Sequence, residues 1–129
     1  MILDSSAIIA IVVREPGWDS LTGKIGSERA IGVGAPTLAE TGIVLTRKIG
    51  RQSRTILSRF LQQANTIVIP FGEEHWRTAL DAYLRFGKGK HSAALNLGDC
   101  LTYATARLAD QPLLCLGDDF AKTDLTIAL

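Results

Sequence analysis

The chain has 129 residues, of which 47% are hydrophobic and 21% are charged. These proportions suit one folded domain, spanning residues 1–129, and exclude a multidomain, collagen-like or intrinsically disordered protein. Because 14 Lys and Arg face 13 Asp and Glu, the formal net charge is +1, and an anionic partner would have to be attracted by the local arrangement of charges.

The first half of the chain alternates short apolar runs with helical patterns. Residues 1–3 predict a strand that Asp4 closes, and Ser5 and Ser6 then open a helix that continues to Val13. Gly50 stops the helix expected at 36–49 and so separates it from the helix expected at 52–64. The other expected elements of this half are a helix, a strand and two helices, at residues 18–26, 30–34, 36–49 and 52–64.

The second half continues the same alternation. A strand at 66–69, a helix at 73–86, a Gly- and Lys-rich loop at 87–92, a helix at 97–109 and strands at 113–116 and 125–127 are expected, in that order. Short strands separated by longer helices favour the α/β class. We therefore expect a three-layer α/β/α arrangement with a mostly parallel central sheet of about five short strands.

The cysteines and the hydropathy pattern concern the compartment. Cys100 and Cys115 lie in apolar runs and are too few for a disulfide framework, so we expect reduced core residues. No run approaches the roughly 18 consecutive apolar residues of a membrane span, and no signal-peptide pattern is present. The sequence predicts a cytoplasmic protein without a membrane anchor.

Several acidic residues fall where the carboxyl ends of parallel strands, and the helices that start there, are expected to meet. They are Asp4, Glu40, Asp99 and the pair Asp118 and Asp119. Crowded carboxylates raise one another's pKa unless protons, cations or basic neighbours compensate. An all-oxygen ligand set favours Mg²⁺ or Mn²⁺ over Zn²⁺, and two such ions could activate water for phosphodiester cleavage.

Each acid also has an ordinary structural explanation. Asp4 could cap the first helix, and Asp99 could merely favour the positive end of its helix dipole. Glu40 could belong to a solvated helix face, and Asp118 and Asp119 could be turn residues. Position alone leaves these explanations open.

Four segments carry a resemblance to a known family. They are MILDSSA at 1–7, LAET at 38–41, LNLGDC at 95–100 together with Tyr103 and Ala104, and LLCLGDDF at 113–120. In this order and at this spacing they resemble the PIN domain, and more narrowly the VapC toxins of bacterial toxin–antitoxin pairs. The resemblance extends over essentially the whole chain.

The resemblance implies a metal-dependent endoribonuclease that leaves a 5′-phosphate and a 3′-hydroxyl. Its implied Mg²⁺ or Mn²⁺ ligands and catalytic residues are Asp4, Glu40, Asp99 and Asp118. Asp119 stays an alternative to Asp118 as the fourth acid. Ser6 is expected to support the site by a hydrogen bond, and Asn96 either orients the loop before Asp99 or caps its helix.

The resemblance also implies partners, namely a homodimer and a cognate VapB-type antitoxin that blocks the active site. The apolar run from Ile8 to Val13, with Trp18 nearby, is either a docking groove or plain core. For the RNA, basic residues occur without any acid between Glu40 and Glu73, and a second basic run begins at Arg85. We expect phosphate contacts from Arg47, Arg51, Arg54, Lys88 and Lys90.

Two rival functions fit part of the pattern. A receiver-like phosphoacceptor signalling domain also uses strand-end acids and Mg²⁺, but it expects paired acids near the first strand, where this chain has only Asp4. A non-catalytic PIN-like binding module would be expected to lack at least one of the matched acids. The substitution Asp99→Asn separates these functions, because it should abolish cleavage and leave pure binding mostly intact.

Overall fold

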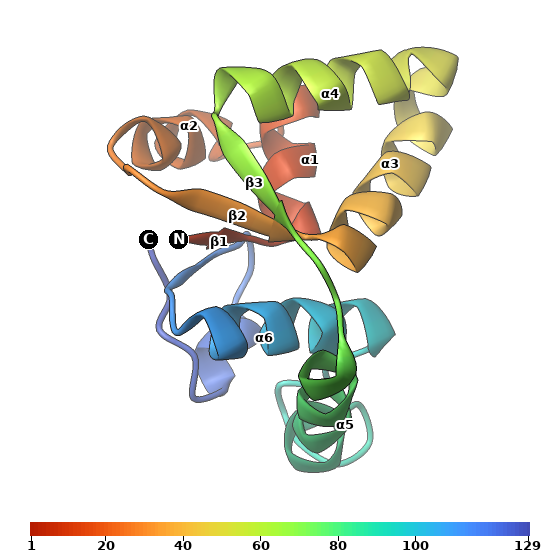
Figure 1. The fold of residues 1–129 in the computed structure, drawn as a ribbon, viewed down its shortest axis with the longest axis vertical. Helices are drawn as coiled ribbons and strands as arrows, with labels where there is room; N and C mark the ends of the chain where they lie inside the picture. Colours follow the sequence, from red (N-terminus) through yellow and green to blue (C-terminus); the bar gives the residue numbers. More distant parts are fainter.

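The computed structural model describes residues 1–129 and shows a parallel sheet between two layers of helices (Figure 1). The sheet has four strands in the order β3-β2-β1-β4, and every neighbouring pair is parallel. The elements in chain order are β1 (Ile2–Leu3), α1 (Ser5–Val13), α2 (Trp18–Gly26), β2 (Ile31–Gly34), α3 (Ala35–Ile49), α4 (Ser53–Gln63), β3 (Thr66–Ile69), α5 (Glu73–Phe86), α6 (Leu97–Ala109) and β4 (Leu113–Leu114). The expected three-layer α/β/α class is confirmed.

The expected number of about five strands is one too high. Residues 125–127 form only a single bridge, between Leu113 and Ile127, because β4 is two residues long and offers little ladder to pair with. β4 also ends at Leu114 instead of Leu116. The backbone amide of Leu116 donates a 2.9 Å hydrogen bond to Oγ of Ser6 and so leaves the sheet.

The two faces of the sheet pack against different helices. Ile2 belongs to the core cluster beneath α5 and α6, whereas its neighbours Met1 and Leu3 belong to the cluster formed with α1 to α4. This is the alternation expected of a strand covered on both faces. Each fully buried large aliphatic side chain contributes about 1.5–3 kcal/mol to folding, so both layers are firmly attached to the sheet.

Two glycines of β2 make room for side chains of neighbouring elements. A Cβ atom at Gly34 would lie 2.6 Å from Oγ1 of Thr105, and one at Gly32 would lie 2.7 Å from Cδ1 of Ile69. The side chains of Thr105 on α6 and Ile69 on β3 therefore occupy the space that a Cβ atom would need. Because Gly34 has no side chain, α6 lies close to β2 at this position.

The two cysteines and part of the apolar run of α1 are buried in the core. Cys100 and Cys115 are buried free thiols, as expected. Ile8 and Ile9 are buried in the core cluster of α1 to α4, so core packing is the correct explanation for this part of the apolar run. No helix has both the length and the apolar character needed to cross a membrane.

Candidate active site

Asp4 lies at the end of β1 and is 4% exposed. Its Oδ2 atom accepts hydrogen bonds from the backbone N of Ser6 at 3.1 Å and from Oγ of Ser6 at 2.6 Å. Asp4 is thus the N-cap of α1, as one of the two explanations held. The Ser6 hydroxyl also accepts a hydrogen bond from the backbone amide of Leu116, so it joins the ends of β1 and β4.

Thr102 on α6 is a site residue that the sequence analysis did not identify. Its Oγ1 atom donates a 2.9 Å hydrogen bond to Oδ1 of Asp4 and lies 3.0 Å from Oγ1 of Thr37 on α3. Both threonines are buried. The only available signal was a polar residue within the apolar face of α6, and that signal does not name its partner.

Glu40 lies in the second turn of α3 and is half-buried. Its carboxylate rests against Gly98 at the start of α6, where an added Cβ atom would overlap Oε2 and would lie 2.9 Å from Cδ and 3.1 Å from Oε1 of the same carboxyl group. Gly98 therefore leaves the space in which the Glu40 carboxylate lies. A solvated surface position does not describe this side chain.

Asp99 and Asn96 form a reciprocal cap at the start of α6. Oδ1 of Asn96 accepts the backbone N of Asp99 at 2.9 Å, and Oδ2 of Asp99 accepts the backbone N of Asn96 at 3.1 Å. Asn96 is thus the N-cap of the helix. Because this bond uses only one carboxylate oxygen of Asp99, capping does not prevent a second role.

The charges around Asp99 show which acids are its neighbours. The pKa of Asp99 is raised above its ordinary value, chiefly because the side chain is partly buried. The backbone hydrogen bond from Asn96 lowers this pKa, whereas the charges of Asp4, Asp119 and Glu40 raise it. The charges of acids from three other segments of the chain therefore act on Asp99. This is the electrostatic consequence expected of crowded carboxylates.

Asp118 and Asp119 both lie exposed in the turn after β4. Burial raises the pKa of the nearby Cys115 thiol to about 12, with further contributions from Asp4, Asp118, Asp119 and Asp99. Of the pair, only Asp119 is among the acids whose charge acts on Asp99. In this structure Asp119 is the electrostatic neighbour of Asp99.

The donor chemistry suits a hard divalent cation, because these side chains offer carboxylate oxygens alone. No three His, Cys, Asp or Glu side chains converge closely enough to enclose an ion as they stand. Asp4 is engaged by Ser6 and Thr102, and Asp99 is turned back toward Asn96. The acids are close enough to interact through their charges, and their hydrogen bonds account for the present orientations.

The expected RNA-contacting residues are all exposed. Lys88 and Lys90 belong to the loop that leads into α6, and Arg47 lies in the last turn of α3, about 10 Å along the helix axis from Glu40. Arg51 and Arg54 follow the end of α3 and lie farther away, since α3 carries the chain from the sheet up to α4 (Figure 1). None of these five residues forms a salt bridge.

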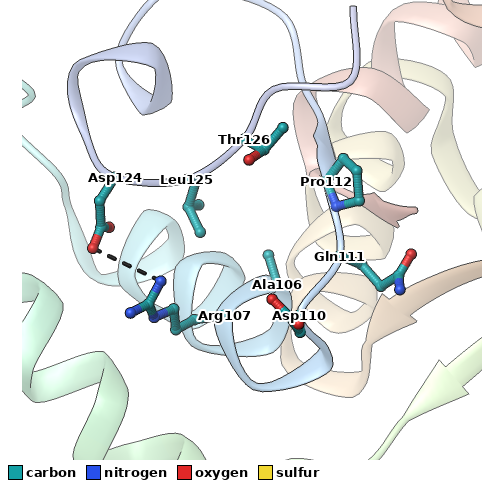
Figure 2. A pocket seen from close by; sticks show the side chains of 8 residues that line it. All are labelled: Ala106, Arg107, Asp110, Gln111, Pro112, Asp124, Leu125 and Thr126. Carbon is teal, nitrogen blue, oxygen red and sulfur yellow. Dashed lines mark ion pairs between the residues drawn. The ribbon is translucent and has the colours of Figure 1, made fainter.

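A pocket lined partly by charged residues lies away from the acids, at the carboxyl end of α6 (Figure 2). It includes Asp110, which caps that end of α6, and Pro112, which precedes β4. Arg107 and Asp124 form an ion pair of 3.9 Å on one side of it. Because β4 begins here and the acids follow its end, the pocket lies at the opposite edge of the sheet.

Comparison with known proteins identifies the family. The family model of the PIN domain matches residues 1–125. The chain belongs to the PIN-domain family. It is 45% identical over 126 residues to ribonuclease VapC36 of Mycobacterium tuberculosis, a match that covers 97% of this chain and 91% of that protein. The predicted resemblance of this chain to VapC proteins is thereby confirmed.

Solved structures show the same PIN fold. VapC20 of Mycobacterium tuberculosis, a sarcin-ricin loop cleaving toxin, matches with a TM-score of 0.80 at 14% identity and covers 97% of this chain and 95% of its own. A toxin-antitoxin complex from Klebsiella pneumoniae matches with a TM-score of 0.70 at 17% identity and covers 95% and 92%. At these identities the likeness concerns the fold alone.

Proposed function

We propose that this PIN-domain chain is a VapC-type toxin, an Mg²⁺- or Mn²⁺-dependent endoribonuclease formed by one domain over residues 1–129. The observation that carries the proposal is the meeting of acids from separate segments at α6. The Glu40 carboxylate lies against Gly98, Asp4 is bonded to Thr102, and the charges of Asp4, Glu40 and Asp119 act on Asp99. The relative VapC36, named a ribonuclease, matches almost the whole chain and supports the same activity.

The metal ligands that we propose are Asp4, Glu40, Asp99 and an acid of the turn after β4. Asp119 is favoured over Asp118 for the fourth position, because its charge acts on Asp99. A bound divalent ion supplies an activated water and stabilises the charge that develops on the phosphate. Ser6 and Thr102 hold the Asp4 carboxylate, and Asn96 holds one oxygen of Asp99, so these residues keep the acids oriented.

RNA is the proposed substrate, and the five exposed basic residues named above are its proposed phosphate contacts. Unpaired cations remain available to an anionic polymer, whereas paired cations are already neutralised. We assign Arg47, Lys88 and Lys90 to the part of the strand near the cleavage point. Arg51 and Arg54 would contact a more distant part of the RNA.

Two protein partners are proposed, namely a VapB-type antitoxin and a second copy of this chain. The antitoxin is supported by the Klebsiella pneumoniae structure, which is a toxin-antitoxin complex of the same fold. The homodimer is supported by an apolar surface of α5 and α6, where Trp76, Leu80, Tyr83 and Leu84 are exposed and Leu97 is 76% exposed. Cytoplasm is the compartment that we propose, since an RNA substrate is found there.

The test of this function is cleavage of total cellular RNA by the purified chain with Mg²⁺, with Mn²⁺ or with EDTA. Discrete products that require the metal and disappear in Asp99→Asn are expected. Asp81→Asn, which changes an exposed acid on α5, is the matched control and should keep full activity. Equal products from the Asp99→Asn variant would indicate a contaminating nuclease, and RNA binding without cleavage would indicate a binding module.

A further inference from the structure

One stripe of α6 faces the segment that follows the acid pair. Asp99, Tyr103 and Arg107 are spaced four residues apart on α6 and therefore share one face of the helix. Phe120, which follows Asp119, packs in the same core cluster as Cys100 and Tyr103 of α6, and the charge of Asp119 acts on Asp99 at one end of this stripe. At the other end, Asp124 contacts both Tyr103 and Arg107. Residues 119–124 thus run alongside α6.

Asp124 joins this segment to two helices. Its Oδ1 atom accepts a 2.7 Å hydrogen bond from the Tyr103 hydroxyl. Its Oδ2 atom lies 3.3 Å from Nη2 of Arg85 on α5 and 3.9 Å from Nη1 of Arg107, the ion pair drawn in Figure 2. The catalytic acids use none of these contacts, so they need an explanation of their own.

Exposed ion pairs alone contribute little to stability, roughly 0–1 kcal/mol. The tyrosine contact differs, because the Tyr103 ring is 2% exposed and packs in the same core cluster as Phe120. Because the Tyr103 ring is fixed in the core, its hydroxyl leaves the bonded carboxylate of Asp124 little freedom to move. Between Asp119 and Asp124 the segment is therefore held twice, by the buried Phe120 ring and by the Tyr103 hydrogen bond.

We propose that Tyr103 and Asp124 are positioning residues for the acidic site, whose hydrogen bond sets the register of residues 119–124 along α6 and so holds Asp119 opposite Asp99. The inference rests on the proposed metal-dependent function. With the bond removed, Phe120 remains as an anchor, but the segment can shift along the helix. The Asp119 carboxylate is then less often placed to share an ion with Asp99.

The test measures Mn²⁺ binding to the purified chain by titration calorimetry, together with RNA cleavage and the unfolding temperature. Tyr103→Phe removes only the hydroxyl, and Asp124→Ala removes the acceptor. Both variants are expected to bind Mn²⁺ about tenfold more weakly, the size typical of residues that orient metal ligands. Asp124→Asn keeps an acceptor for the Tyr103 hydroxyl and should recover most of the affinity.

Ser53→Ala is the stability control, because Ser53 is a buried hydroxyl that contacts Thr46 far from the acids. It should lower the unfolding temperature and leave Mn²⁺ affinity unchanged. Unchanged affinity in Tyr103→Phe and Asp124→Ala, with a wild-type chain that binds Mn²⁺ and cleaves RNA, overturns this inference alone. A wild-type chain that binds no Mn²⁺ overturns the proposed function and this inference with it.

Discussion

Thr102 donates a hydrogen bond of 2.9 Å to Oδ1 of Asp4, across 98 residues of sequence. The bond joins α6 to the end of β1 inside the protein, where an ionised carboxylate depends on its donors. Together with the two bonds from Ser6, it fixes the orientation of the Asp4 carboxylate. The hydroxyls around Asp4 are therefore part of the candidate site.

The first prediction concerns this bond. Thr102→Val preserves the shape of the side chain but removes the donor, so Asp4 loses one partner in a buried place. We expect the free energy of unfolding to fall by about 1–3 kcal/mol and RNA cleavage to slow. Thr105→Val is the control, because Thr105 is equally buried on α6 but donates to the carbonyl of Leu101. Equal cleavage rates in the two variants would contradict the role given to Thr102.

A second prediction follows from the contact between Glu40 and Gly98. Gly98→Ala adds a Cβ atom where the Glu40 carboxylate lies, so the carboxylate must move and RNA cleavage is expected to fall at least tenfold. Stability should change little, because alanine favours a helix over glycine by up to about 1 kcal/mol and offsets part of the strain.

Gly23→Ala provides the comparison for that variant. A Cβ atom at Gly23 on α2 would meet nothing within 4 Å, so only the helix propensity changes. Both cleavage and stability should be at least those of the wild type, as measured by initial rates and thermal unfolding. Full activity in Gly98→Ala would show that the position of Glu40 does not matter.

The third prediction uses the raised pKa of Asp99, which reflects burial first and then the charges of neighbouring acids. When a group has a higher pKa in the folded state than in the unfolded state, its contribution to stability is fully present below the unfolded-state pKa. That contribution is lost as pH rises through the folded-state pKa. Asp99→Asn removes the ionisable group and with it this loss of stability. We expect the variant to unfold at a higher temperature than the wild type at pH 7, in the absence of metal.

The same comparison at low pH tests the sign. Well below pH 4, which is about the ordinary pKa of an aspartic acid, Asp99 is protonated in both the folded and the unfolded state, and the advantage of Asp99→Asn should vanish. Asp81→Asn should show no such pH-dependent gain. An advantage that persists or grows at low pH would mean that the charge of Asp99 is not the cause.

The fourth prediction concerns the unpaired cations. Arg47→Ala and Lys88→Ala are each expected to weaken RNA binding and to reduce the slope of log affinity against log salt by about one. Arg77→Ala is the control, because Arg77 is already paired with Glu73 at 3.0 Å. Filter binding with Asp99→Asn protein at several salt concentrations measures the slopes. Unchanged slopes would place the RNA on another surface.

The fifth prediction concerns the apolar surface of α5 and α6. Leu80→Glu places a charge in this surface, and we expect it to convert a dimer into a monomer in sedimentation equilibrium. Leu80 is 51% exposed, so the folded monomer should tolerate the change. Ile43→Glu is a matched control on α3 with 58% exposure and should remain dimeric. A wild-type chain that is monomeric at all concentrations would refute the proposed dimer.

Local patterns sufficed to predict most elements of the fold. The β-branched run at residues 66–69 is β3, and the expected helices at 18–26, 73–86 and 97–109 match α2, α5 and α6. Such runs are stabilised by periodic burial and by turn residues that lie next to them in sequence. The prediction of a fifth strand at residues 125–127 was wrong for the converse reason. Whether these residues form a strand depends on the length of β4, the strand with which they would pair.

The order of the motifs was enough to predict the PIN family and the acids at the ends of the strands. Their contacts depend on which distant segments meet, and no local pattern carries that information. Where α6 packs against Gly34 of β2, Thr102 meets Asp4 and Gly98 meets Glu40. The hydrogen bond between Tyr103 and Asp124 likewise exists only because the chain folds back along α6, so the neighbours of each acid were beyond what its sequence position could reveal.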